Sequence, residues 1–136
     1  MKSFKSTNLK GVRPKLPRVS DEMKAWSAAL SSEVLDWPQV TTRAFFGFTA
    51  LYRRARIFAL LPRTRAMETP NSMAFKLEFP PSRILMRLQQ DSRVGSTEMR
   101  KARWFTFEMT SGPDLRDALD WLGHAYEAAG KSKTRS

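Results

Sequence analysis

Few side chains in this chain are of a type and spacing that could do catalytic chemistry. Its only histidine, His124, follows Asp120 by four residues, a helical spacing that predicts an exposed ion pair rather than a general base, because no nucleophile or orienting partner accompanies it. Asp114, Asp117 and Asp120 repeat every three residues and could resemble a row of metal ligands, but acids near a helix start also favour the helix dipole. We favour the second interpretation and expect no catalytic residues, no metal and no cofactor.

Arginine is the residue type that stands out. The segment 43–65 contains six arginines and no acid. Arg53, Arg54 and Arg56 fall at one predicted hairpin turn, which places their charges within a Debye length of roughly 8–10 Å. Guanidinium groups bind phosphates in bidentate geometry, so a basic hairpin suits a nucleic-acid backbone. The predicted nucleic-acid-binding residues are Arg43, Arg53, Arg54, Arg56, Arg63 and Arg65; a solvated turn without a ligand is the alternative.

Aromatic residues alternate with these arginines and could extend such a site. Exposed rings can stack on bases, whereas phenylalanines at strand spacing more often pack in a core. We favour core packing for this set, which consists of Phe45, Phe46, Phe48, Tyr52 and Phe58.

The net charge of +11 is unevenly distributed along the chain. Residues 1–18 carry six cations and no acid, and residues 131–136 carry three, which is typical of flexible tails. A second basic group contains Arg83, Arg87, Arg93, Arg100, Lys101 and Arg103 and faces only Asp91 and Glu98 in the sequence. The first and last predicted helices are each net negative, so the domain is expected to be electrically polarised.

Hydrophobic periodicity supplies the elements that would position these residues. A helix is expected to start at Ser20, to bury a stripe at three- and four-residue spacing, and to end at Trp37-Pro38. Proline at 80–81 suits the start of a short second helix, and a third helix is expected between Pro113 and Gly130. Alternating or continuous apolar runs predict strands in the segments 40–47, 48–52, 57–61, 72–79 and 103–109. The segment 91–102 reads as irregular.

The hairpin turn has neither Gly nor Asn. A two-residue turn with positive φ would strain Arg54 or Ala55, so a four-residue or bulged loop is expected there. Strand 57–61 is apolar on both faces, which predicts a central strand covered on both sides, with a second subunit as one candidate cover.

These elements predict an α+β fold, an antiparallel sheet of about four to five strands packed by N-terminal and C-terminal helices. The 136 residues suit one domain, 19–130, flanked by a basic arm at 1–18 and a basic tail at 131–136. No apolar run of about 18 residues occurs, so no membrane span is expected. The absence of cysteine suits a reducing cytoplasm.

Parts of the sequence resemble a pair of known families over about residues 20–129. The hairpin "FFGFTALYRRARIFALLP" is similar to TfoX N-terminal domains, and "MAFKLEFPPSRILMRLQQDSRVGSTEMRKARWFTFEM" is similar to the MmcQ/YjbR group. "DLRDALDWLGHAYEAA" fits the terminal helix of both. Two positions depart from the pattern: a glycine pair is replaced by Gly47-Phe48, and the usual turn glycine by Ala55. The resemblance implies a small α+β domain, DNA-binding-like in some members, and brings no catalytic residues.

From the sequence we therefore expect a cytoplasmic, non-enzymatic domain that associates with nucleic acid through the basic hairpin, helped by the N-terminal arm. Such binding would be mostly non-specific and sensitive to salt. The alternative is a protein-interaction module that binds an acidic protein or forms a homodimer.

Overall fold

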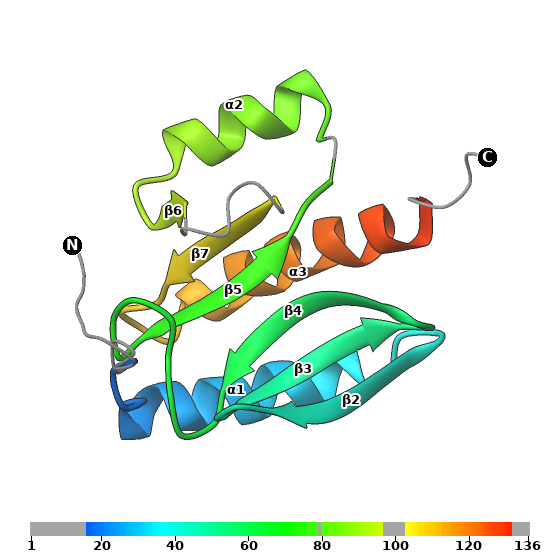
Figure 1. Cartoon of the computed structure of the whole chain (residues 1–136). Helices are drawn as coiled ribbons and strands as arrows, with labels where there is room; N and C mark the ends of the chain where they lie inside the picture. The colour runs from blue at the N-terminus through cyan, green and yellow to red at the C-terminus, as the bar shows by residue number, and fades with distance from the viewer. Residues whose placement is uncertain (1–15, 79, 97–102, 132–136) are drawn as a thin grey trace, which may run out of the picture.

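A computed structural model describes residues 16–78, 80–96 and 103–131 of the chain. Six strands form one antiparallel sheet in the order β2-β3-β4-β5-β7-β6 (Figure 1). The strands are β2 (Val40–Phe45), β3 (Phe48–Arg53), β4 (Arg56–Pro62), β5 (Ser72–Lys76), β6 (Val94–Ser96) and β7 (Trp104–Glu108). The helices are α1 (Asp21–Val34), α2 (Ser82–Gln90) and α3 (Asp114–Lys131). The predicted α+β fold is confirmed.

The sheet has more strands than expected because β6 lies inside the segment that we expected to be irregular. Its three residues pair with β7, from Val94 opposite Phe107 to Ser96 opposite Phe105. A strand of three residues is too short to show a period-two pattern, so sequence periodicity could not reveal it. The remainder of that segment, residues 97–102, lies outside the described residues, together with Glu98, Arg100 and Lys101.

Helix α1 begins where its sequence predicts. The Ser20 hydroxyl accepts a hydrogen bond from the backbone N–H of Met23 at 3.0 Å, which satisfies one of the unpaired amides of the first turn. Met23, Leu30 and Val34 are fully buried along one stripe. Helix α3 runs one residue past Gly130, so our expectation that this glycine would end the helix is wrong.

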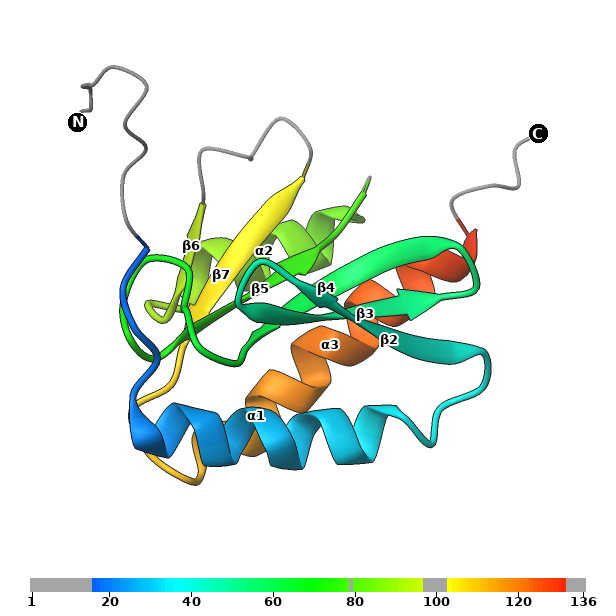
Figure 2. The same ribbon diagram turned by 60° about the horizontal axis from the view of Figure 1, so that its bottom comes forward.

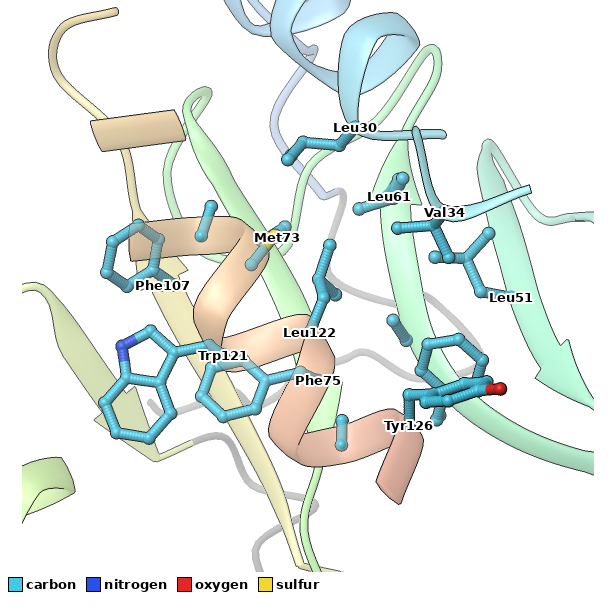
Figure 3. Close-up of a cluster of buried hydrophobic side chains, with 14 of the residues drawn as sticks. Leu30, Val34, Leu51, Leu61, Met73, Phe75, Phe107, Trp121, Leu122 and Tyr126 are labelled. Atoms are coloured by element: carbon cyan, nitrogen blue, oxygen red, sulfur yellow. The ribbon is translucent and has the colours of Figure 1, made fainter. Parts of the chain in front are cut away.

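Helices α1 and α3 lie on the same side of the sheet (Figure 2), and Ile84 and Leu88 of α2 join the same core. Leu30 and Val34 of α1 meet residues of the strands and of α3, including Met73, Phe75 and Leu122 (Figure 3). Trp121 is buried and stacks on Phe75, with ring centroids 5.4 Å apart. One side of β2–β4 packs in this core, and the opposite side of these strands faces away from the helices.

That other side of the sheet is here called the open face, and no residue of a described helix belongs to its apolar cluster. Strand β4 contributes to both sides, as expected for a central strand. The buried members of the open-face cluster are Phe48, Ala50, Leu60, Ala74 and Trp104, with Tyr52, Ile57 and Met67 packed against them. The loop that carries Met67 supplies part of the cover.

The described chain starts at Leu16, and its first residues pair with the loop that follows β4. The backbone N–H of Ala66 donates to the Pro17 carbonyl at 2.9 Å, and that of Val19 donates to the Thr64 carbonyl at 3.2 Å. Pairing thus begins at Pro17, inside the segment 1–18 that we expected to be a basic arm. The rest of the predicted arm, residues 1–15, and the tail residues 132–136 lie outside the described residues.

In the described part of the chain, no helix combines the length and the apolar character needed to cross a membrane.

Candidate nucleic-acid interface

Arg93 is bound by carboxylates from two elements. Its guanidinium lies 2.9 Å from Asp91, 2.9 Å from Asp114 and 3.0 Å from Asp117, and it covers the Phe107 ring at 4.8 Å. The hydrogen bond from Arg93 lowers the pKa of Asp91, and the backbone N–H of Thr110 together with Arg93 lowers the pKa of Asp114. The same carboxylates raise the pKa of Arg93, so its charge is matched locally.

Arg87 is neutralised in a second, more exposed cluster. It donates to Asp120 at 2.8 Å, lies 3.1 Å from Nε2 of His124 and covers the Trp121 ring at 5.0 Å. The predicted pairing of His124 with Asp120 is present at 3.7 Å, an ion pair when the imidazole is protonated.

These two clusters correct our prediction for the second basic group. Arg87 and Arg93 are bound by acids of α3, which lie far away in the sequence. The aspartates of α3 are therefore partners of arginines, rather than only a solvated face that favours the helix dipole. Among the described residues, no group of three or more His, Asp or Glu side chains is arranged to hold a metal ion.

Arg53 does not project from the hairpin turn as we predicted. Its guanidinium packs over the Tyr126 ring at 4.2 Å and donates to the Tyr126 carbonyl at 3.1 Å and to Oε1 of Gln39 at 3.3 Å. A Cβ built at Gly130 would overlap this guanidinium, so the glycine in α3 makes room for Arg53. Arg53 therefore fixes the C-terminal end of α3 to the hairpin.

Arg54 and Arg56 are the arginines that the turn exposes. The turn is a tight one, since Arg53 pairs directly with Arg56, and Arg54 adopts a left-handed φ of 57°. Our prediction of a four-residue loop is wrong, although the hairpin does have a register irregularity between Leu51 and Tyr52, close to the turn. The backbone N–H of Arg54 donates to the Gln39 carbonyl at 2.9 Å, and this bond offsets part of the strain. Both side chains line a shallow hollow of about 420 Å³ beside Gln39 and Gly130.

Arg63 and Arg65 lie at the opposite end of the hairpin, beside the turn between β2 and β3. The Gly47 carbonyl accepts hydrogen bonds from the backbone N–H groups of Arg63, Thr64 and Arg65, at 3.0, 2.9 and 3.2 Å. The side chain of Arg65 is half-buried and donates to the Leu16 carbonyl at 3.1 Å, so it holds the N-terminal segment. Arg63 is exposed.

Arg43 lies between these two ends, in the middle of the edge strand β2. It pairs with Ala50, which places it on the open face, and its guanidinium lies 5.3 Å from the centre of the Tyr52 ring. The distance between the hairpin ends is set by β3, whose six residues span roughly 17 Å at about 3.4 Å per residue. The six predicted arginines thus form no single cluster. They are spread along the ribbon β2–β4 and over both of its faces, because Arg53 and Arg56 border α3 and Arg63 borders α1.

Four of the six keep exposed guanidinium groups with no carboxylate within ion-pair distance among the described residues. These four, called the ribbon arginines below, are Arg43, Arg54, Arg56 and Arg63. Glu78 lines a hollow with Arg56, but its carboxylate pairs with Lys76 at 3.3 Å.

The turn between β2 and β3 also exposes an aromatic pair. Phe46 is 83% exposed and has a left-handed φ of 47°, which is rare for a large side chain. Phe45 is 40% exposed and meets Phe46 edge to face, with centroids 4.9 Å apart. Phe48 and Phe58 are buried and Tyr52 is half-buried, so our preference for core packing holds for these three and is wrong for Phe45 and Phe46.

Comparison with known proteins gave no match to any family model, curated protein or solved structure. The resemblance to the TfoX and MmcQ/YjbR families therefore stays a prediction.

Proposed function

We propose that this chain is a non-enzymatic, cytoplasmic domain that associates with nucleic acid through phosphate contacts of the ribbon arginines. The observation that carries the proposal is the division of the arginines into two kinds. Arg87 and Arg93 have aspartate partners, whereas the ribbon arginines lie on a segment, residues 37–67, that contains no acid. Unmatched surface cations cost free energy through mutual repulsion, and a polyanion removes that cost.

The arrangement suits a chain of phosphates better than a single anion. The ribbon arginines are spread along β2–β4, with Arg43 on the open face and with Arg56 and Arg63 bordering hollows beside α3 and α1. A flexible backbone with a charge on every nucleotide can reach several of them, whereas a single anion cannot. Residues 1–15 would add five cations to such binding. Contacts to phosphates do not distinguish one base sequence from another, so we expect mostly non-specific, salt-sensitive binding.

Anisotropy titrations with labelled single-stranded and duplex oligonucleotides test the proposal. Two double variants, Arg54→Gln with Arg56→Gln and Arg43→Gln with Arg63→Gln, each remove two ribbon arginines. Two exposed ionic contacts at roughly 0.5–1 kcal/mol each predict an affinity about 5- to 30-fold weaker for each variant at low salt.

The matched control is the double variant Arg83→Gln with Arg116→Gln. Both residues are exposed, one on α2 and one on α3, and the control loses the same net charge as each ribbon variant. We expect its affinity to change by less than about twofold. If the control loses as much affinity as the ribbon variants, the effect is one of net charge and not of the ribbon arginines. If the unmodified chain does not bind oligonucleotides at low salt, the proposal is wrong.

A homodimer is the second candidate, and the edge strand β2 favours it. Strand β2 pairs only with β3 in the described sheet, so its outer backbone groups could pair with a second copy. Light scattering distinguishes the candidates: the dimer predicts twice the chain mass of 15.6 kDa at micromolar concentration without nucleic acid.

A further inference from the structure

We propose that the nucleic acid is single-stranded and that Phe46 stacks on one of its unpaired bases, with Arg43 at a flanking phosphate. This inference rests on the proposed function and deepens it, because phosphate contacts alone do not distinguish a single strand from a duplex. The evidence lies at the turn between β2 and β3, where an exposed ring lies close to an exposed cation.

The turn holds the Phe46 ring out in solvent. Phe46 occupies the left-handed region and is followed by Gly47 at a φ of 90°, so both residues between the two strands have positive φ. The Gly47 carbonyl, with its three backbone donors in residues 63–65, fixes this geometry to the end of β4. A Cβ added at Gly47 would lie 2.8 Å from Cγ of Arg65, so the close approach depends on the glycine. Large side chains avoid such backbone conformations unless neighbouring contacts enforce them, and enforced ones gather at functional sites.

Aromatic and cationic side chains share one surface at this place. Phe45 and Arg43 are two residues apart on β2 and therefore lie on the same face, roughly 7 Å apart along the strand. Phe45 supports the Phe46 ring edge to face. Arg63 is joined to this turn through its backbone N–H, which donates to the Gly47 carbonyl at 3.0 Å, but its side chain lines a hollow beside Ser27 and Ser31 of α1, on the other side of the ribbon. A stacking ring next to a cation is an arrangement by which proteins hold single strands without reading sequence.

The surroundings favour a base over an apolar protein surface or a lipid tail as the occupant. Phe45 and Phe46 form a small apolar area, and their exposed neighbour Arg43 would have to lose water against an apolar partner. An unpaired nucleotide supplies both a flat π-face for Phe46 and an anionic group for Arg43. A duplex keeps its bases stacked, and opening it costs free energy that a single strand does not require.

The experiment titrates the full chain with labelled oligothymidylate, with an abasic phosphodiester strand of the same length and with a hairpin duplex. Phe46→Asn keeps a residue that tolerates the left-handed conformation and removes the ring, so its fold is preserved. We expect it to bind oligothymidylate about 5- to 150-fold more weakly, the range for one lost base–aromatic stack. Binding to the abasic strand should stay unchanged.

Three further variants separate stacking from other causes. Phe46→Trp should keep or strengthen oligothymidylate binding, whereas Phe46→Leu, which stays apolar without a ring, should lose it. Met86→Ala is the matched control, because Met86 is also an exposed apolar side chain, 56% exposed on α2, and it should change nothing.

The results that overturn the inference are an equal loss on the abasic strand, full binding by Phe46→Leu, or tighter binding of the duplex than of oligothymidylate. If binding depends on the ribbon arginines but not on Phe46, this inference alone fails. If the unmodified chain binds none of the three probes, the proposed function fails with it.

Discussion

Replacing Arg93 is predicted to be the most destabilising single change of charge in the described chain. Arg93→Met keeps an apolar stem against Phe107 and removes the cation that Asp91, Asp114 and Asp117 share. The side chains of Asp91 and Asp114 are only 15% and 14% exposed, so water cannot fully replace the lost partner.

The magnitude follows from those two carboxylates. A hydrogen bond to a charged group contributes roughly 1.5–3 kcal/mol, and two of them give about 3–6 kcal/mol. Arg93 is itself 30% exposed, and Asp114 keeps hydrogen bonds from the backbone of Thr110 and Ser111. Solvent screening and these remaining bonds reduce the expected loss in the free energy of unfolding to about 2–4 kcal/mol.

Urea unfolding followed by circular dichroism measures this loss, with Arg87→Met as the matched control. Arg87 makes an ion pair whose side chains are 49% and 50% exposed, so its loss is expected to cost about 0.2–1 kcal/mol. The reasoning is refuted if Arg93→Met loses no more stability than Arg87→Met.

Three further predictions concern stability. Ser20→Ala should lower the free energy of unfolding by about 1 kcal/mol in urea titration, because the N-cap bond is lost; no change would contradict the cap. Gly130→Ala should stabilise by about 0.5–1 kcal/mol in an Arg53→Ala background, the usual gain of alanine in a helix, but not in the unmodified chain, where the new Cβ displaces Arg53; a double-mutant cycle with zero coupling would contradict this. The lowered pKa values of Asp91 and Asp114 stabilise the fold above their ordinary pKa of 3.8, so acid titration should show stability falling as the pH drops through and below that value, and less steeply in Arg93→Met.

The local parts of the fold could be read from the sequence. Helix α1 could be predicted from Ser20 as an N-cap and from apolar residues at helical spacing, because both signals act within a few residues. The order of helices and strands gave the α+β class in the same way. Strand β6 was not predicted, because its three residues are too few to show a period and its only strand partner in the described sheet is β7.

The site was less predictable, because its decisive contacts join residues far apart in the chain. Arg93 finds Asp114 and Asp117 across more than twenty residues, and Arg53 reaches the Tyr126 carbonyl from 73 residues away. No periodicity encodes which arginine has such a partner. Gly130 was one signal that could have been interpreted differently, since a glycine inside an amphipathic helix can mark the close approach of another side chain.

The conformations of the two turns were not predicted, for a related reason. Propensity disfavours positive φ at Arg54 and Phe46, yet both adopt it. The Gln39 carbonyl accepts a hydrogen bond from the N–H of Arg54, and the backbone N–H groups of residues 63–65 donate to the Gly47 carbonyl, so both turns are held by partners outside them. Tertiary bonds here override the local preference, and for Phe46 the result is the exposed ring from which we infer base stacking.

The salt dependence of oligothymidylate binding tests the central claim, that the ribbon arginines neutralise phosphates, most directly. Each phosphate contact to a single strand contributes about 0.7 to the slope of log affinity against log salt concentration. Replacing all four ribbon arginines by glutamine should therefore reduce that slope by about 2.8, which is four times 0.7. A slope that is the same in this variant and in the unmodified chain would contradict the account.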